Sequence, residues 1–317
     1  MDKINVTVDE GNIRIDQFLV NTYPKLSRSK IQHLIKTEHI KVDGLAIKPS
    51  LKLKGGELVS GEIIEVGSEN IIPEQIDLDI VYEDEDIIVI NKPSGLVVHP
   101  GNGNFSGTLV NGLVYHFNNL SDKDASRPGI IHRLDKDTTG ILVVAKNNHA
   151  HDFISEQFAN RKIYKEYEAI AWGEVSKEGV VEGLIGRDKN NRVLFNMVEN
   201  NGKTSKSSYF LKGYYAPLSH VKLIPYTGRT HQLRVHMKSI GHPIFCDELY
   251  NGGKKNIKSF ESSYSLQLTK AMKNINRVAL HAKKIELRLP STNNKIAFEV
   301  DLPDDMKSVL DIVNNDK

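Results

Sequence analysis

The sequence predicts an α+β protein with a small N-terminal domain, residues 1–70, and a larger domain, residues 76–317. Three observations lead to this prediction. The first domain shows a helix pair followed by a hairpin signal, and residues 67–75 form a polar stretch that is typical of a linker. The larger domain mixes short apolar runs with helical stripes, and its predicted strands outnumber its predicted helices.

The N-terminal domain begins with two short amphipathic segments. The first apolar stripe consists of Ile15, Phe18 and Leu19, and the second consists of Ile31, Leu34 and Ile35. This spacing places each stripe on one face of a helix, and Ser27 is a suitable N-cap for the second helix. Short strands are expected next, because Asp43-Gly44 is a hairpin turn signal.

The same segment is strongly basic. Residues 14–54 contain nine lysines and arginines against three acids, which is 9 − 3 = +6, so the rest of the chain sums to 2 − 6 = −4. Arg28, Lys30 and Lys36 fall outside the apolar stripe of the second helix. A solvated face is the ordinary explanation for such residues. The bias of sign within so small a domain favours RNA binding instead.

The larger domain opens with apolar runs. Buried strands are expected at residues 87–90 and 141–145, and partly alternating strands at residues 164–172 and 220–226. A helical stripe between the strands consists of Ala150, Phe153, Ile154 and Phe158. Thr230 can cap a further helix with an apolar face of Leu233, Met237 and Ile240, which Gly241 can end. Surface loops are expected at residues 116–129 and 251–265.

Composition excludes several classes of site and location. The single cysteine, Cys246, rules out an intramolecular disulfide and a cysteine-based metal cluster, which fits a cytoplasmic protein. The N-terminus carries acids where a signal peptide carries bases, and the apolar runs are too short to cross a membrane. The spacing of His231 and His236 does not match a helical zinc pattern, and residues 101–107 miss the dinucleotide fingerprint. We therefore expect no metal and no cofactor.

Asp135 is the candidate catalytic residue. It lies in the charged loop 133–140, directly before the predicted strand 141–145, and loops at strand ends often carry function. A polar turn with a surface ion pair is the simplest alternative. A phosphatase of the haloacid dehalogenase type is another, but there the hydrophobic strand precedes the Asp-x-Asp motif, whereas here it follows. A carboxylate without a cofactor suits covalent or electrostatic chemistry, and the pattern alone does not select the reaction.

Residues 80–300 resemble the RluA/RluD family of pseudouridine synthases. Five motifs carry the resemblance in the family's order: NKPSGLVVHP at 91–100, GIIHRLDKDTTGILVVAK at 129–146, KEYEA at 165–169, TGRTHQLRVHM at 227–237, and GHPI at 241–244 with LHA at 280–282. Residues 12–70 resemble a small RNA-binding domain named after a ribosomal small-subunit protein, here called S-four-like. The resemblance implies a catalytic domain with a mixed, mainly antiparallel sheet and flanking helices. Thr139, where many relatives have serine, and Glu57, near an otherwise usual Gly-Asp turn, depart from the pattern.

The resemblance also implies roles for single residues. Asp135 would be the essential carboxylate and Arg234 its partner, while Tyr167 would stack on the target base or help to remove the proton from carbon 5. Leu233 would pack against the base, and Arg133 would fill the space left by a flipped nucleotide. The lysines that could contact phosphates are Lys92, Lys136 and Lys165.

The implied activity is the isomerisation of uridines to pseudouridines, which requires no cofactor. The implied partner is large-subunit (23S) ribosomal RNA or a precursor of the large ribosomal subunit. The protein is expected to act as a monomer and not to associate with a membrane. Two alternatives stay open: the same chemistry on transfer RNA, and a non-catalytic RNA-binding factor in ribosome assembly. The sequence does not decide which atom Asp135 attacks.

Overall fold

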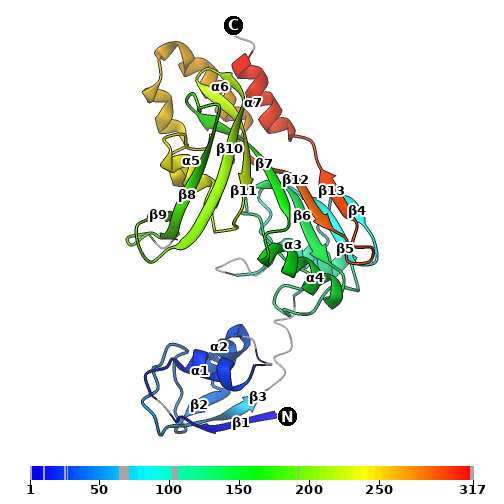
Figure 1. Ribbon diagram of the computed structural model, residues 1–317, viewed down its shortest axis with the longest axis vertical. Helices are drawn as coiled ribbons and strands as arrows, with labels where there is room; N and C mark the ends of the chain where they lie inside the picture. The colour runs from blue at the N-terminus through cyan, green and yellow to red at the C-terminus, as the bar shows by residue number, and fades with distance from the viewer. Residues whose placement is uncertain are drawn as a thin grey trace. The chain divides into compact units, whose positions relative to one another are not determined.

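The computed structural model describes residues 2–9, 11–24, 26, 28–63, 71–101, 106–191 and 193–314. The chain divides into two compact units, residues 1–70 and residues 71–317 (Figure 1). The predicted N-cap Ser27, the side chain of Lys30 and residues 67–70 of the predicted linker lie outside the described part. None of the helices in the described ranges is long and apolar enough to span a membrane.

The N-terminal unit consists of two helices and a small antiparallel sheet. Its elements are β1 (Asp2–Thr7), α1 (Ile15–Thr22), α2 (Arg28–Lys36), β2 (Ile40–Val42) and β3 (Leu58–Ile63), with strand order β1-β3-β2. The two predicted stripes meet in one core, where Ile15, Leu19, Ile31, Leu34 and Ile35 are buried and Phe18 is partly buried. Both predicted helices are therefore confirmed.

A buried carboxylate joins the two helices of this unit. Asp16 accepts hydrogen bonds from Arg14 and Arg28, each at distances near 3.0 Å, and from Gln32 at 2.6 Å. Burial alone would raise the pKa of Asp16, but these donors lower it to about 2. Two of the nine bases thus serve the fold. Glu57, which departs from the usual Gly-Asp turn, also has a structural role, because its carboxylate accepts hydrogen bonds from the backbone N–H groups of Lys54 and Gly55.

The larger unit contains a ten-stranded sheet in the order β4-β5-β6-β12-β7-β11-β10-β8-β9, with β13 paired to β12. The strands are β4 (Ile80–Glu83), β5 (Ile87–Lys92), β6 (Thr139–Ala145), β7 (Tyr164–Trp172), β8 (Glu178–Arg187), β9 (Phe195–Val198), β10 (Lys203–Tyr215), β11 (Leu218–Pro225), β12 (Leu280–Arg288) and β13 (Lys295–Glu299). Only β6 and β12 pair in parallel among the described strands of this sheet. The mixed, mainly antiparallel sheet is confirmed.

Helices cover the two halves of the sheet differently. The α-helices are α3 (Leu109–His116), α4 (Asn148–Ala159), α5 (Gln232–Ser239), α6 (Ser265–Asn274) and α7 (Asp304–Asn314). On β5, Ile88 and Ile90 join the core with α3, whereas Ile87 and Val89 face the core with α4. The core of the other half contains residues of β7, β11 and helices α5, α6 and α7, of which α6 and α7 lie side by side (Figure 1).

Three local expectations about the larger unit need correction. The N-cap of α5 is His231 rather than Thr230. The predicted loop 251–265 contains the 3-10 helices η2 (Lys254–Ser259) and η3 (Ser262–Tyr264), which follow η1 (Glu248–Tyr250). Residues 71–75 are not a free linker, because the Asn111 side chain of α3 donates to the Ile72 carbonyl at 2.9 Å.

Two glycines of the motifs have clear structural reasons. Gly241 ends α5 as predicted: its φ is +84°, and the N–H groups of Gly241 and His242 bond back to the carbonyls of Lys238 and Met237. Gly140 lies where β6 and β12 approach closely. Its φ is +107°, and a Cβ there would lie 2.2 Å from the Ala282 carbonyl oxygen. A larger residue would displace β6 together with the loop that leads into it.

Candidate active site

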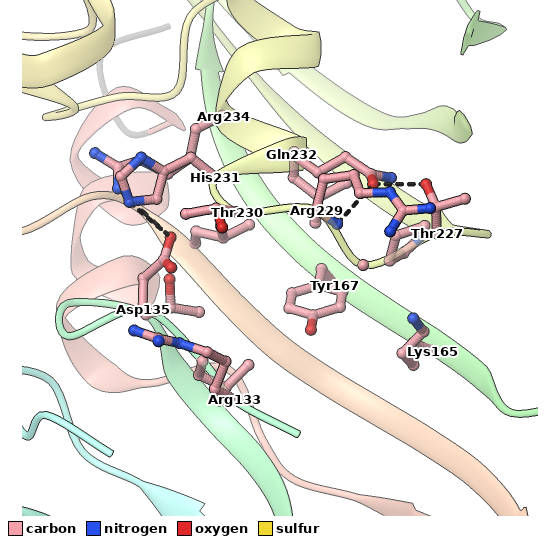
Figure 2. Close-up of a pocket in the computed structure, with 16 residues that line it drawn as sticks. Arg133, Asp135, Lys165, Tyr167, Thr227, Arg229, Thr230, His231, Gln232 and Arg234 are labelled. Carbon is pink, nitrogen blue, oxygen red and sulfur yellow. Dashed lines mark hydrogen bonds and ion pairs between the residues drawn. The ribbon is translucent and has the colours of Figure 1, made fainter. Parts of the chain in front are cut away.

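A pocket opens in the larger unit where the loop before β6 faces β7 and the start of α5 (Figure 2). Its lining includes all five residues that the family resemblance implies for the site: Arg133, Asp135, Tyr167, Leu233 and Arg234. These residues are separated by up to about a hundred positions in the chain, so the sheet brings them together. The other polar side chains of the lining are Lys165, Thr138, Thr227, Thr230, Arg229, His231 and Gln232.

Asp135 presents its carboxylate to this pocket from a tight turn. The N–H of Thr138 donates to the Asp135 carbonyl at 3.1 Å, which holds the turn just before β6. The Asp135 side chain keeps 24% of its surface exposed. Nη1 of Arg234 lies 3.5 Å from its Oδ2, and Nε2 of His231 lies 3.8 Å from the same atom.

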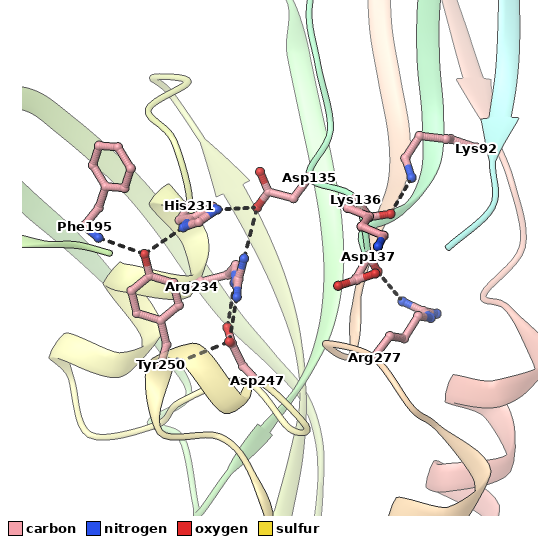
Figure 3. Close-up of polar contacts among 10 residues, drawn as sticks. All are labelled: Lys92, Asp135, Lys136, Asp137, Phe195, His231, Arg234, Asp247, Tyr250 and Arg277. Carbon is pink, nitrogen blue, oxygen red and sulfur yellow. Dashed lines mark hydrogen bonds and ion pairs between the residues drawn. The ribbon is translucent and has the colours of Figure 1, made fainter. Parts of the chain in front are cut away.

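Arg234 is itself fixed by a second carboxylate, Asp247, that the sequence reasoning did not single out for the site. Nε and Nη2 of Arg234 donate to the two oxygens of Asp247, both at 2.7 Å (Figure 3). The Asp247 side chain is fully buried and that of Arg234 is 9% exposed. Such a two-point bond fixes both the plane and the charge of the guanidinium. Arg234 therefore makes its two short hydrogen bonds with Asp247 and directs its remaining nitrogen, Nη1, toward Asp135.

Two buried cationic side chains, Lys92 and Arg277, hold the loop that carries Asp135 by hydrogen bonds to its backbone carbonyls. The ammonium of Lys92 donates to the carbonyls of Pro93, Leu96 and Lys136, at 2.7, 3.0 and 2.9 Å. Nη1 of Arg277 reaches the carbonyl of Asp137 at 3.4 Å (Figure 3). The prediction that Lys92 contacts phosphate is therefore wrong, because the residue is fully buried and its three N–H donors are all used.

The burial of Lys92 lowers the pKa of its ammonium group, while its hydrogen bonds stabilise the fold. Burial lowers its pKa to about 8, against the opposing charges of Asp137 and Asp135. The group is therefore still mainly protonated at neutral pH. Replacement by methionine is expected to reduce the free energy of unfolding by about 3 kcal/mol, because three backbone carbonyls lose their donor. Urea denaturation followed by circular dichroism would measure the difference.

Lys136→Met provides the matched control for this substitution. Lys136 is exposed, and it contributes its backbone carbonyl rather than its side chain to the contact with Lys92. Its replacement should change the unfolding free energy by less than about 0.5 kcal/mol. Equal effects of the two substitutions would contradict the anchoring role of Lys92.

On the opposite side of the pocket, β7 supplies Tyr167 and Lys165. Burial, reinforced by the charge of Asp135, raises the pKa of Tyr167 above its ordinary value, so the phenol stays protonated at neutral pH. Burial lowers the pKa of Lys165 to about 8, and its ammonium lies 5.8 Å from the centre of the Phe158 ring. Lys165 thus lines the pocket as a partly desolvated cation, which suits contact with an anion.

The two remaining predicted residues, Arg133 and Leu233, lie at the edge and in the wall of the pocket. Arg133 is exposed at the pocket, close to Asp135 in Figure 2, and Leu233 is buried with 7% exposure in the core behind it. Gln232, which the sequence reasoning missed, accepts from the Thr227 hydroxyl at 2.6 Å and donates to the Lys206 carbonyl at 3.0 Å. It ties the loop before α5 to β10. The signal for it was its place inside the motif of residues 227–237.

Comparisons with known proteins agree with this arrangement. A family model described as RNA pseudouridylate synthase matches residues 86–239, and a model described as S4 domain matches residues 13–59. "Uncharacterized RNA pseudouridine synthase YlyB" of Bacillus subtilis (strain 168) is 38% identical over 98% of both chains. "Ribosomal large subunit pseudouridine synthase D" of Escherichia coli O157:H7 is 39% identical over 99% of this chain and 95% of its own.

A solved structure supports the fold of the larger unit as well. "Human RNA Pseudouridylate Synthase Domain Containing 4" superimposes with a TM-score of 0.57 at 25% sequence identity. The match covers 74% of this chain and 92% of the human chain.

Proposed function

The chain belongs to the RNA pseudouridylate synthase family, and we propose from this premise that it converts uridines of large-subunit ribosomal RNA to pseudouridines, with Asp135 as the catalytic carboxylate. The observation that supports this role most directly is the approach of Asp135 Oδ2 to Arg234 Nη1, at 3.5 Å, within a pocket that also contains Tyr167. The reaction breaks the bond between N1 and the ribose, turns the base and rejoins it through carbon 5.

Each route to pseudouridine requires an ionised carboxylate. Asp135 can attack the ribose, attack the uracil ring, or take a proton from the ribose to form a glycal. Arg234 directs its Nη1 toward Oδ2 of Asp135, and Asp247 keeps that guanidinium in place. The isomerisation transfers no electrons to or from another molecule and donates no group, so side chains can supply the chemistry.

Tyr167 fits a stacking role better than that of a base. A phenol whose pKa is raised by burial rarely loses its proton at neutral pH. Its ring stands beside Asp135 in the pocket, where a flipped uracil would enter (Figure 2). We infer that Tyr167 and Leu233 hold the faces of the base, while the exposed Arg133 occupies the space that the base leaves in the RNA.

The preference for ribosomal over transfer RNA rests on the relatives and on the N-terminal unit. The Escherichia coli relative is named for the large ribosomal subunit, and it covers this chain almost completely. A single chain brings Asp135, Tyr167 and Arg234 into one pocket, which supports the proposal that a monomer is sufficient. We also propose that it acts on ribosomal RNA in the cytoplasm. The first alternative predicts modification of transfer RNA, whereas the assembly-factor alternative predicts RNA binding without modification.

One experiment separates these possibilities. The purified protein would be incubated with unmodified 23S ribosomal RNA, with unmodified transfer RNAs and with small-subunit ribosomal RNA, and pseudouridines would be mapped chemically. New pseudouridines in the 23S RNA alone support the proposal. Modification of transfer RNA alone would replace the proposed substrate. No modification of any RNA, with binding retained, would favour the non-catalytic assembly factor.

The basic side chains of the N-terminal unit are expected to make RNA binding strongly salt-dependent. Lys36, Lys48 and Lys52 are exposed there, and nothing in the core depends on them. Replacing all three with glutamine should weaken binding to ribosomal RNA fragments and reduce the slope of log affinity against log salt by about 0.9 for each phosphate that is no longer neutralised. Filter binding at several salt concentrations measures the slope.

A matched triple substitution in the larger unit controls for total charge. Lys255, Lys258 and Lys270 are also exposed, and they do not line the pocket. Their replacement with glutamine changes the net charge equally and should alter the slope less. If both triple variants lower the slope by the same amount, the N-terminal lysines act only through net charge.

A further inference from the structure

His231 connects Asp135 to a buried tyrosine. Its Nε2 lies 3.8 Å from Oδ2 of Asp135, and its Nδ1 lies 2.7 Å from the hydroxyl oxygen of Tyr250 (Figure 3). Tyr250 is fully buried in η1, close to Asp247 in sequence. The ring of His231 therefore lies between the pocket and the interior of the larger unit. The contact of Arg234 with Asp135 does not depend on this position, so His231 can have a role of its own.

The backbone of His231 is held in a conformation that few residues adopt. As the N-cap of α5 it has φ +56° and ψ +19°, in the left-handed region. Outside glycine this conformation costs on the order of 1 kcal/mol and persists where surrounding contacts fix it. The rings of Phe195 and Tyr250 meet the His231 ring edge-on, with centroids 5.8 and 5.5 Å away. The side chain is thus fixed in direction from both ends.

A proton count assigns the tautomer of the ring. The Tyr250 hydroxyl accepts the backbone N–H of Phe195 at 3.0 Å. Its single proton then needs an acceptor, since a buried hydroxyl proton without one costs about 1–3 kcal/mol. The Nδ1 of His231 is that acceptor, at 2.7 Å. A neutral ring that accepts at Nδ1 carries its own proton on Nε2, the nitrogen that faces the Asp135 carboxylate.

The charges around the ring agree with a neutral imidazole. Burial lowers the pKa of His231 most, and the positive charges of Arg234 and Arg133 lower it further. The charges of Asp135 and Asp247 act in the opposite direction. The ordinary histidine pKa is about 6.5, so a lowered value keeps the ring neutral at pH 7.

We propose that His231 is a positioning residue for Asp135, and that Tyr250 sets its tautomer so that a neutral Nε2–H faces Oδ2 of the carboxylate. Arg234 approaches the same oxygen, at 3.5 Å, so both groups lie on the Oδ2 side of the carboxylate, and the proposal leaves Oδ1 for the substrate. This inference rests on the proposed function of Asp135. The tautomer can be measured without any RNA, and it can therefore be tested separately.

Nuclear magnetic resonance of the full chain, labelled with ¹⁵N-histidine, tests the tautomer directly. The His231 signals would be assigned by their loss in His231→Asn. The proposal expects a neutral ring with the proton on Nε2 at pH 7, and a Tyr250→Phe variant in which the ring is protonated at higher pH. A ring with its proton on Nδ1, or a fully protonated ring at pH 7, in the wild-type protein would overturn the proposal.

Turnover measurements test the effect on Asp135. Asparagine keeps an acceptor near the position of Nδ1 and tolerates the left-handed backbone, whereas glutamine keeps a donor near the position of Nε2. His231→Asn should lower kcat by about tenfold with little change in KM, and His231→Gln should lose less. Equal losses in the two variants would overturn the positioning role.

The pH dependence supplies a further readout. Loss of the Tyr250 donor lets Nδ1 take a proton more easily, which raises the pKa of His231 and reduces the neutral fraction at low pH. The acidic limb of the kcat profile should therefore move up by about one pH unit in Tyr250→Phe. Tyr115→Phe, at an exposed position outside the pocket, should leave it unchanged. An unmoved limb in Tyr250→Phe counts against the proposal, while a wild-type protein without turnover counts against the proposed function instead.

Discussion

Asp135→Asn is expected to reduce pseudouridine formation by about 10³-fold or more, with almost no change in RNA affinity. Asparagine has nearly the same shape as aspartate, but it can neither attack a carbon atom as a carboxylate nor accept a proton at neutral pH. The Asp135 side chain is partly exposed, and the turn and the Lys92 contact that fix the loop involve backbone carbonyls, which the substitution keeps. The fold should therefore persist, and single-turnover assays with 23S RNA fragments would measure the loss.

Asp137→Asn is the matched control for this experiment. It removes the same charge from the same loop, and Asp137 does not line the pocket. The contact of Asp137 with Arg277 is made by its backbone carbonyl, which the substitution keeps. We expect most of the activity to remain. Turnover by Asp135→Asn that matches the wild-type rate would exclude Asp135 as the catalytic carboxylate.

Asp247→Asn is expected to lower the free energy of unfolding by about 3 kcal/mol and to slow turnover as well. The substitution leaves the Arg234 guanidinium buried without its two-point partner, since Asp247 is fully buried and Arg234 is 9% exposed. Arg234 would then turn toward the only other carboxylate it contacts in the described structure, Asp135. Tighter pairing there would make Asp135, the proposed catalytic carboxylate, a weaker base and nucleophile.

Denaturation with urea and single-turnover kinetics together measure both effects of Asp247→Asn. Glu248→Gln provides the control, because Glu248 is the exposed neighbour of Asp247 and makes no contact with Arg234. Its free energy of unfolding should stay within about 0.5 kcal/mol of the wild-type value. A stable Asp247→Asn variant with normal turnover would show that Arg234 does not depend on this partner.

The elements that could be predicted from the sequence are those that depend on local periodicity. The continuous apolar runs at residues 87–90 and 141–145 are central strands because both faces of each strand are covered. The stripe that begins at Ala150 is confirmed as α4 for the same local reason. Each of these patterns is formed by residues that are close together in the chain, so a single stretch of sequence contains the whole signal.

The contacts that fix the site depend on distant residues and leave no local pattern. A buried lysine and an exposed lysine look alike in sequence, so Lys92 was predicted to contact phosphate, although its partners are three backbone carbonyls. Asp247 is not predicted for the site, because its partner Arg234 lies on a different element. The tautomer of His231 depends on the Tyr250 hydroxyl, which in turn depends on a backbone N–H of β9.

The anchoring of the Asp135 loop by Arg277 also bears on how the protein is made. The guanidinium that reaches the Asp137 carbonyl is held by the two oxygens of Asp305, at 2.7 and 2.8 Å, at the start of α7. Among the described elements of the larger unit, α7 comes last in the chain and is therefore synthesised after the others. A growing chain thus carries Asp135 long before it carries the carboxylate that supports its loop. The loop that carries Asp135 acquires these anchors only after Asp305 has been translated.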